Sequence, residues 1–285
     1  MKKILIIGGN RFVGKALAKV LLDKGYMVDV FNRSGTSPDD RVTYTIKGDR
    51  NKDKDLWKID INRYDGIVDM CLYKHSQFEL LRKYIRFTRV RAMARDLKYI
   101  FVSSGAADER YIDYYGDYGK EKLEIETALE STPLNYKIVR PSYIVGIGNH
   151  RPRLGHYIDQ LSNAKKSVKV DGDGKNKINV VFVQDVVKVL ETLIDDDVEG
   201  KKFDVCGNIS FTVVDLVKRI NKELNSKKKK SKRVKFSFNK EDAILPKNTF
   251  VFDNKKTKKE LGITFTNFTK GLKEYIKWYK NEKNL

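Results

Sequence analysis

The sequence predicts an α/β protein with a doubly wound parallel sheet and a smaller C-terminal lobe. Short apolar runs rich in branched residues alternate with segments of helical apolar spacing, and a glycine-rich turn follows the first run at once. Near-continuous apolar strands are typical of a parallel sheet that helices cover on both faces. No apolar stretch approaches the length of about 18 residues that a membrane span needs, so we expect no membrane partner.

The order of the elements supports this fold class. Six strands are expected before Pro141, and the segments expected as strands are 3–7, 27–31, 42–46, 66–72, 98–104 and 136–140. Helices are expected after the first strand, from residue 76 to about Arg95, and over 117–130. After Pro141 the rhythm changes, and we expect strands at 178–183 and 202–206 and helices at 213–224 and 267–280. The first domain is therefore expected to comprise 1–144 and about 178–207, and the lobe about 145–177 and 208–285.

The charge is strongly positive: 58 Lys and Arg oppose 38 Asp and Glu, which gives a formal net charge of +20. Such a field favours anionic partners such as nucleotides, phosphosugars or RNA. A lysine-rich composition with a well-solvated surface explains the same number, and the run at 227–233 is typical of a solvated segment. Cys71 and Cys206 both lie in apolar runs, which does not indicate a disulfide framework, and the first apolar run is too short for a signal peptide. We therefore expect a cytoplasmic protein.

The turn IIGGNRFVGKAL is the first candidate site. A glycine-rich strand-to-helix turn presents backbone N–H groups and a helix dipole to a pyrophosphate. Gly8 permits the tight turn and Gly14 permits close packing of helix on sheet, whereas Arg11 stands where such folds often carry another glycine. A simple tight turn is the alternative. The residues expected to bind the cofactor here are Gly8, Asn10, Arg11, Phe12, Val13 and Gly14.

The end of the second strand bears on the choice of cofactor. An acidic residue there binds the adenosine ribose, but this chain has Asn32 followed by Arg33, and arginine favours a 2′-phosphate. We therefore expect NADP in preference to NAD, unless Arg33 is merely an exposed loop cation. After the third strand, Asp49 is placed to bond the adenine amino group, with Arg50 beside it as a further cofactor contact.

The stretch DYGKEK supplies the expected reactive group. Tyr118 and Lys122 are four residues apart and share a helix face, and Ser104 ends the fifth strand. Ligands bind at the carboxyl ends of parallel strands, so Ser104 and the glycine-rich turn are expected to open on the same side. A neighbouring ammonium favours phenolate, which lets a tyrosine exchange a proton with an alcohol or carbonyl. Tyr279 and Lys283 repeat the spacing without such neighbours.

Together these residues resemble the extended short-chain dehydrogenase/reductase superfamily, in its nucleotide-sugar epimerase/dehydratase branch. The segments that carry the resemblance are GGNRFVG, VSSG, YGKEK, RPSYIVG, INVVFVQDVV and FDVCGN. The resemblance implies a Rossmann domain with a substrate-binding lobe, and often a homodimer formed through a four-helix bundle that includes the tyrosine helix. It implies that Ser104, Tyr118 and Lys122 are catalytic, and that Lys122 also binds the nicotinamide ribose. It further implies cofactor contacts by Pro141, Ile144, Cys71 and Leu72.

Several departures narrow the function. The glycine pattern with Arg11 is closer to a divergent subgroup that includes chloroplast stem-loop RNA-binding proteins. After Ser104 comes GAA, where 4,6-dehydratases carry an Asp-Glu pair, and Asp108 and Glu109 lie too far along to assume that role. The resemblance therefore favours a reductase or 4-epimerase over a dehydratase.

On the substrate side, Arg151 and Arg153 are placed to pair with a diphosphate, unless they form an exposed basic loop. No metal site is expected, because the histidines lack suitable neighbours and DGDGKNK reads as a turn between strands. The favoured function is NAD(P)-dependent oxidation, reduction or epimerisation of a nucleotide-activated sugar. The alternatives are nucleic-acid binding on a dinucleotide fold and a cofactor-binding sensor without turnover. Neither the sugar nor the nucleotide can be read from the sequence.

Overall fold

The computed structural model describes residues 1–91, 97–150, 153–163, 167–226, 234–239, 245 and 248–283. The chain divides into two compact units. The first unit comprises Met1–Pro141, Val186–Val205 and Lys255–Ile263, and the second comprises Ser142–Asp185, Cys206–Asn254 and Thr264–Leu285. In the described ranges, no helix has both the length and the apolar composition needed to cross a bilayer.

A seven-stranded sheet forms the centre of the first unit, and all its strand pairs are parallel. The spatial order is β11-β6-β5-β4-β1-β2-β3, so the strand order reverses between β1 and β4. This arrangement confirms the predicted doubly wound sheet, and ligands of such folds bind at the reversal point. The strands are β1 (Lys3–Ile7), β2 (Met27–Asn32), β3 (Tyr44–Lys47), β4 (Gly66–Asp69), β5 (Lys98–Val102), β6 (Asn135–Pro141) and β11 (Lys202–Val205).

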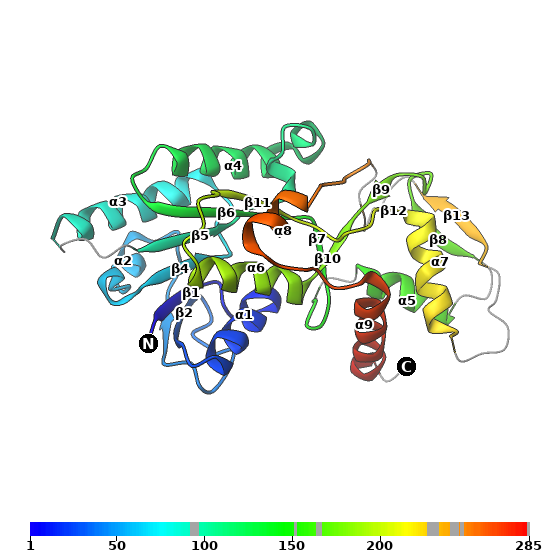
Figure 1. Cartoon of the computed structure of the whole chain (residues 1–285), viewed down its shortest axis with the longest axis horizontal. Coiled ribbons are helices and arrows are strands. Elements are labelled where there is room, and N and C mark those ends of the chain that lie inside the picture. Colours follow the sequence, from blue (N-terminus) through cyan, green and yellow to red (C-terminus); the bar gives the residue numbers. More distant parts are fainter. Residues whose placement is uncertain are drawn as a thin grey trace. The chain divides into compact units, whose positions relative to one another are not determined.

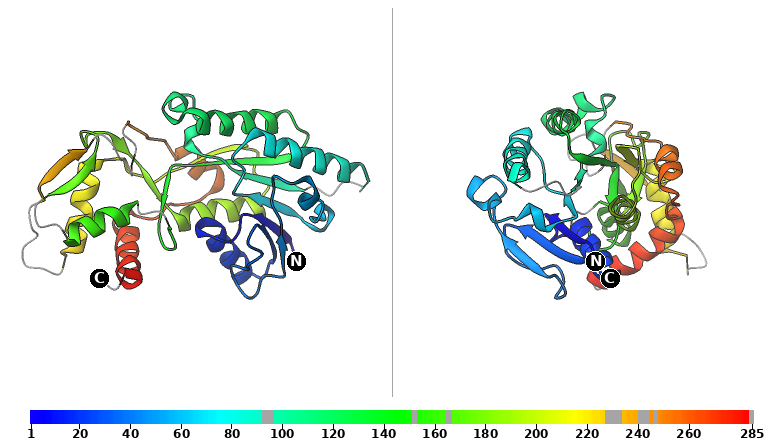
Figure 2. Two further views of the ribbon diagram at one scale, coloured as in Figure 1. Left: turned by 180° about the vertical axis from the view of Figure 1, so that it is seen from behind. Right: turned by 60° about the vertical axis from the view of Figure 1, so that its left-hand side comes forward.

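Helices cover both faces of this sheet. Figure 1 shows α3 and α4 on one face and α1 and most of α6 on the other. The reverse view in Figure 2 agrees that α3 and α4 lie side by side. The helices and 3₁₀ turns of this unit are α1 (Phe12–Asp23), α2 (Asp53–Leu56), η1 (Ile61–Arg63), α3 (His75–Arg91), η2 (Gly105–Ala107), α4 (Ile112–Glu130), α8 (Lys255–Leu261) and, from Val186 onward, α6 (Val183–Asp195).

The core of the first unit explains its continuous apolar strands. Every residue of β1 is buried, because helices pack on both faces of the sheet. The cluster on the α4 side joins the central strands to that helix through Ile7, Phe101, Ile125 and Leu129. Because hydrophobic burial holds α4 against β5, residues on the inner face of this helix have defined positions over the strand ends.

Some element boundaries differ from the prediction. The strand expected over 66–72 ends at Asp69, because the Cys71 backbone N–H bonds the Asp69 carboxylate 3.2 Å away and leaves the ladder. The helix expected to reach about Arg95 extends to Arg91, and residues 92–96 lie outside the described residues. The segment Lys255–Ile263 joins the first unit, where the Thr257 hydroxyl donates to the Asp204 carbonyl at 2.8 Å.

Within its described residues, the second unit contains three two-stranded sheets and three helices. Its pairs are β7 (Tyr143–Val145) with β10 (Val180–Phe182), β9 (Lys177–Ile178) with β12 (Phe211–Thr212), and β8 (Val168–Asp171) with β13 (Phe236–Asn239). Its helices are α5 (Leu154–Asn163), α7 (Val213–Leu224) and α9 (Phe268–Lys283). The single strand expected over 178–183 is interrupted at Asn179, because this buried amide bonds the Phe252 backbone instead of continuing the strand.

Candidate active site

The phosphate-binding turn joins β1 to α1. Gly8 adopts φ +88°, and a Cβ there would lie 3.1 Å from both Cβ and Sγ of Cys71. A Cβ on Gly14 would lie 2.6 Å from the Gly8 carbonyl oxygen and 2.7 Å from Gly9 Cα, both backbone atoms. The turn therefore requires glycine at Gly8 for conformation and at Gly14 for space, as the sequence predicts.

The start of α1 carries no acidic side chain that would oppose an anionic ligand. Arg11 is the N-cap but makes no side-chain capping bond, and the first turn carries no acidic residue. Phe12 has φ +43°, a conformation that is strained in a non-glycine residue and often marks functional sites. Arg11 is exposed and has no ion pair among the described residues, so its guanidinium is available at the mouth of the turn.

The loop after β2 is tied to the phosphate-binding turn. The Asn10 amide donates to the hydroxyls of Ser34 and Thr36 at 2.8 and 2.5 Å. Asn32 closes the loop from within, since its amide oxygen accepts bonds from the Ser34 hydroxyl and the Gly35 N–H, at 2.9 and 2.7 Å. Asn10 and Asn32, both predicted to bind the cofactor, thus shape this loop through hydrogen bonds of their side-chain amides.

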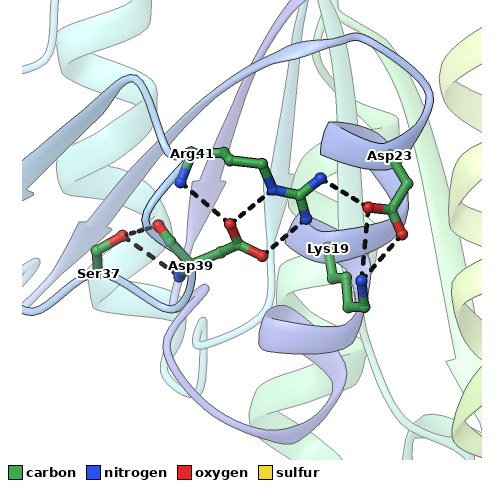
Figure 3. Close-up of polar contacts among 5 residues, drawn as sticks. All are labelled: Lys19, Asp23, Ser37, Asp39 and Arg41. Atoms are coloured by element: carbon green, nitrogen blue, oxygen red, sulfur yellow. Dashed lines mark hydrogen bonds and ion pairs between the residues drawn. The ribbon is translucent and has the colours of Figure 1, made fainter.

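The cations of this loop differ in their partners. Arg41 donates to both Asp39 and Asp23, and Lys19 also binds Asp23 (Figure 3). These bonds, that of Arg41 first, hold the pKa of Asp23 below its usual range. Arg33, in contrast, is exposed and has no ion pair in the described part of the chain.

Asp49 stands at the neighbouring strand end. Its carboxylate accepts bonds from the Asn51 backbone N–H and side-chain amide at 3.0 and 2.7 Å. The backbone bond is the main reason that its pKa is lowered, and the guanidinium of Arg33 acts in the same direction. Arg33 and Asp49 therefore share the carboxyl edge of β2 and β3.

The predicted tyrosine–lysine pair lies over the end of β5. Lys122 is only 2% exposed, and its ammonium donates to the Leu72 carbonyl at 2.6 Å and to the Val102 carbonyl at 3.2 Å. Its nitrogen lies 5.9 Å from the centre of the Tyr118 ring, whereas Tyr118 itself is 41% exposed. Burial lowers the pKa of Lys122 to about 7. A buried ammonium thus sits beneath a tyrosine that solvent and ligand can reach.

The serine turn packs against the same helix. Ser104 caps η2, and its hydroxyl oxygen accepts the Ala106 N–H at 3.2 Å. A Cβ on Gly119 would lie 2.5 Å from the Ala106 carbonyl oxygen, so the residue after Tyr118 touches the turn that begins at Ser104. The Ser104 hydroxyl hydrogen remains able to donate to a ligand. The structure therefore brings the neighbourhoods of Ser104, Tyr118 and Lys122 together.

A break in α4 precedes the tyrosine. Gly116 has φ 53° and ψ −136°, a conformation essentially restricted to glycine, in the middle of Ile112–Glu130. Residues from Asp117 onward thus form a helix of their own, as predicted, preceded by one additional turn. Tyr118 consequently lies in the first turn of this inner helix, where the helix dipole favours negative charge.

The buried ion pair between Arg50 and Asp69 was not predicted from the sequence. Arg50, expected to contact cofactor, is buried, and both terminal nitrogens of its guanidinium bind Asp69 at 2.6 and 2.9 Å. The Tyr99 hydroxyl also donates to Asp69, at 2.9 Å. The only signal in the sequence was an acidic residue inside the apolar run GIVDMCL.

A second buried cluster anchors α4. Glu126, one turn beyond Lys122, is fully buried and accepts the Ser103 hydroxyl at 2.5 Å and two nitrogens of Arg140. This carboxylate fixes α4 to the ends of β5 and β6. Glu126 continues the four-residue spacing of Tyr118 and Lys122 and so lies on the same helix face. This continued spacing is the signal in the sequence from which Glu126 could have been predicted.

The remaining predicted residues have the following places. Cys71 packs on Gly8, and burial raises the pKa of its thiol, while the Leu72 side chain is buried in the core. Pro141 ends β6 in the first unit. In the second unit Ile144 lies on β7 and the Arg153 guanidinium stacks on the Tyr143 ring, 4.4 Å from its centre. Arg151 lies outside the described residues.

Comparisons with solved structures agree with the fold. The chain superposes on a dTDP-glucose 4,6-dehydratase from Bacillus anthracis in complex with NAD with a TM-score of 0.76, at 17% identity, covering 100% of this chain and 98% of that one. For a UDP-glucose 4-epimerase from Thermotoga maritima with UDP-glucose, the TM-score is 0.75, the identity 18% and the coverage 99% of each chain. At these identities the likeness shows the fold alone.

Sequence comparison adds a relative and a family. Chloroplast stem-loop binding protein of 41 kDa b from Arabidopsis thaliana is 26% identical over 244 residues, which cover 76% of this chain and 62% of that protein. The chain therefore spans less than two thirds of this relative's length. Residues 4–206 match the family described as NAD dependent epimerase/dehydratase, and this range includes every predicted catalytic and cofactor residue. Since the match extends over more than half of its length, the chain belongs to the NAD dependent epimerase/dehydratase family.

Proposed function

We propose that the protein oxidises and reduces a carbon of a nucleotide-activated sugar, with Tyr118 as the proton-transfer residue and NADP as the preferred cofactor. The observation that carries this proposal is the Lys122 ammonium, buried and held by two backbone carbonyls, 5.9 Å from the Tyr118 ring centre. Membership of the epimerase/dehydratase family supports it, as do fold relatives described with NAD or UDP-glucose.

The chemistry needs one hydride and one proton to move. When bound, the nicotinamide supplies the hydride acceptor or donor at the sugar carbon. Tyr118, favoured as phenolate by the nearby ammonium, accepts the proton of the sugar hydroxyl and returns it in the reverse direction. Ser104 donates a hydrogen bond to the same sugar oxygen and orients it. In the oxidising direction the C–H bond would give up a hydride and the O–H bond a proton, and the electron pair of the broken O–H bond would become the second bond of the carbonyl.

An epimerase or reductase is favoured over a 4,6-dehydratase. Elimination of water needs a separate acid and base, and Ser104 is followed by Gly105, Ala106 and Ala107. Asp108 is the first acid beyond them, and Arg110 occupies both of its carboxylate oxygens at 2.8 Å. That carboxylate is therefore paired with Arg110.

The preference for NADP rests on the exposed Arg33 at the end of β2. A guanidinium there pairs with the 2′-phosphate, whereas the more usual acidic residue would repel it. We expect Arg33→Gln to weaken NADP binding by about 10- to 100-fold, the worth of a charge-assisted bond, and to change NAD binding little. Isothermal titration calorimetry with both dinucleotides measures the ratio.

Arg41 provides the matched control for this experiment. It belongs to the same loop, but Asp39 and Asp23 already bind its guanidinium (Figure 3). Arg41→Gln should therefore leave the NADP to NAD affinity ratio near that of the wild type. An unchanged ratio in Arg33→Gln would show that another residue selects the cofactor.

The second unit is proposed to hold the nucleotide-sugar. Arg153, stacked on Tyr143, and Arg151 in the adjacent segment are the proposed partners of the substrate diphosphate. The whole function is tested by incubating the protein with NADP or NAD and a panel of UDP- and dTDP-sugars, with products identified by NMR. Absence of turnover and of any thermal shift across the panel would reject a sugar-nucleotide substrate. A homodimer formed through a four-helix bundle that includes α4, the helix of Tyr118, is proposed by family resemblance and is tested by light scattering.

Nucleic-acid binding is the second candidate. Two observations support it: the net charge of +20, and the relative from Arabidopsis thaliana, whose name describes a stem-loop binding protein. Helix α9 adds lysines on one side of its buried stripe: Lys270, Lys273, Lys277, Lys280 and Lys283. The lysine run 227–233 lies outside the described residues. Phosphate-dominated binding weakens steeply with salt, so absence of RNA binding even at low salt would remove this candidate.

A further inference from the structure

The Asp69 carboxylate is a buried charge that the proposed reaction does not use. It is fully buried at the carboxyl end of β4. Its oxygens accept four hydrogen bonds: two from Arg50, one from the Tyr99 hydroxyl and one from the Cys71 backbone N–H. A buried carboxylate needs hydrogen-bond donors of this kind to remain charged.

Its partner Arg50 is equally committed. Arg50 is 6% exposed, its Nη1 also reaches Cys71 Sγ at 3.6 Å, and its buried Nε has no hydrogen-bond partner among the described residues. Taking two charges out of water is costly, and an apolar pair of similar size often serves stability as well or better. A contribution to stability alone therefore does not explain why a buried ion pair lies at the carboxyl ends of the strands.

The pair is connected to Lys122 through two successive residues. Asp69 holds the backbone N–H of Cys71, and the carbonyl of the next residue, Leu72, accepts the Lys122 ammonium at 2.6 Å. Arg50 arrives from the loop after β3, next to Asp49, and so ties that loop to the segment after β4. Any shift of the pair would move the carbonyl that positions Lys122.

We propose that the Arg50–Asp69 pair is a positioning device for Lys122: it fixes the Met70–Leu72 segment, whose Leu72 carbonyl receives the ammonium. The catalytic relevance of this device rests on the proposed function. The positioning itself rests on the contacts alone.

The two charges of the pair have opposite effects on the pKa of Lys122, and this difference can be measured. Burial is the main cause of the lowered pKa of Lys122; Asp69 acts to raise this pKa and Arg50 to lower it further. The other groups that face or act on the ammonium come from the segment after β4, from β5 and from α4, and they are Cys71, Tyr73, Phe101, Tyr118 and Glu126. None of these residues is substituted in the variants of the pair, so a changed titration of Lys122 reports on the pair.

The decisive test titrates Lys122 itself. With lysine labelled at Cε with ¹³C and the Lys122 signal assigned by Lys122→Arg, NMR gives the pKa without any substrate. We expect Asp69→Asn to lower it and Arg50→Met to raise it, each by about one pH unit, as for removal of one nearby charge. Shifts of both variants in the same direction, or no shift in either, would overturn the proposal.

Two further variants keep the test independent of folding defects. The double variant Arg50→Met/Asp69→Leu removes both charges and also the acceptor of the Cys71 N–H, so Lys122 should not return to its wild-type titration. A wild-type titration in this variant would show that the pair acts through its charges alone and would contradict the positioning. Asp29→Asn disturbs another buried ion pair of the same unit, with Lys3, in the amino-terminal half of the sheet. It should lower stability and leave the titration of Lys122 unchanged.

The outcomes separate this proposal from the function. If turnover is found, its rate should fall at alkaline pH as Lys122 loses its proton. The pH of this fall should decrease in Asp69→Asn and increase in Arg50→Met. If no sugar nucleotide is turned over but the two titrations move apart as expected, the proposed function fails and the positioning stands. If a sugar nucleotide is turned over but the titration of Lys122 is unchanged in both variants, the proposed function stands and the positioning fails.

Discussion

Tyr118→Phe is expected to lower kcat by about 10²- to 10⁴-fold on whichever sugar nucleotide the protein accepts, the usual worth of a positioned acid–base group. The substitution removes only the phenolic oxygen that exchanges the proton. Tyr118 is 41% exposed, so the free energy of unfolding should change little, and dinucleotide binding should persist. Steady-state kinetics, with urea denaturation of the same samples, measures both.

Tyr279→Phe is the matched control, because Tyr279 and Lys283 repeat the spacing of Tyr118 and Lys122. Tyr279 is buried on α9 and its hydroxyl donates to Asp159 at 2.7 Å, while its ring fills the space beside Gly155. Its loss should lower stability by about 1 kcal/mol and leave kcat intact. Equal turnover by Tyr118→Phe and the wild type would assign proton transfer to another group.

The contrast between the two tyrosines shows what a sequence pattern can and cannot decide. The four-residue spacing is identical, and only the chain order relative to β5 and the glycine-rich turn distinguished them. The structure bears out this distinction in space: Lys122 bonds the Val102 carbonyl at the end of β5, whereas Tyr279 packs on α5. Order along a parallel sheet is informative because all strand ends meet at one edge.

The sheet itself was predictable because its strands are continuous apolar runs. The boundaries were less so, because a strand ends where side chains capture backbone groups, as Asp69 captures the N–H of Cys71. The interruption at Asn179 has the same origin, since its amide binds the backbone of Phe252, distant in sequence. The short strands of the second unit lacked a periodic signal, because two to four residues carry little pattern.

The charged interior of the site could not be read from the sequence. Arg50 was expected to face a ligand, and the partner that holds it, Asp69, is 19 residues away on another strand. Glu126 and Arg140 likewise meet only after α4 docks on β6. Pairings of this kind depend on strand register and helix packing, which local propensity does not contain. They are also the features that set the position of the predicted catalytic residues.

Lys3→Met is expected to lower the free energy of unfolding by about 3–5 kcal/mol, the usual cost of leaving a buried charge without its partner. Lys3 Nζ lies 2.9 Å from the Asp29 carboxylate, and the two side chains are 9% and 0% exposed. The Tyr64 hydroxyl also donates to the Asp29 carboxylate, at 2.8 Å. The other carboxylate oxygen, Asp29 Oδ1, has no hydrogen-bond partner among the described residues. Without the ammonium, one neutral bond must support a buried negative charge. Urea denaturation monitored by circular dichroism measures the loss.

Lys19→Met makes the same chemical change at an exposed pair and serves as the control. Lys19 lies 3.1 Å from Asp23, but their side chains are 64% and 46% exposed, and Arg41 also binds that carboxylate (Figure 3). Water and Arg41 replace the lost contact, so the change should stay within about 0.5 kcal/mol. The difference between the two variants isolates the effect of burial from that of the lysine itself. A cost for Lys3→Met no larger than that for Lys19→Met would mean that water reaches Asp29 in the folded protein.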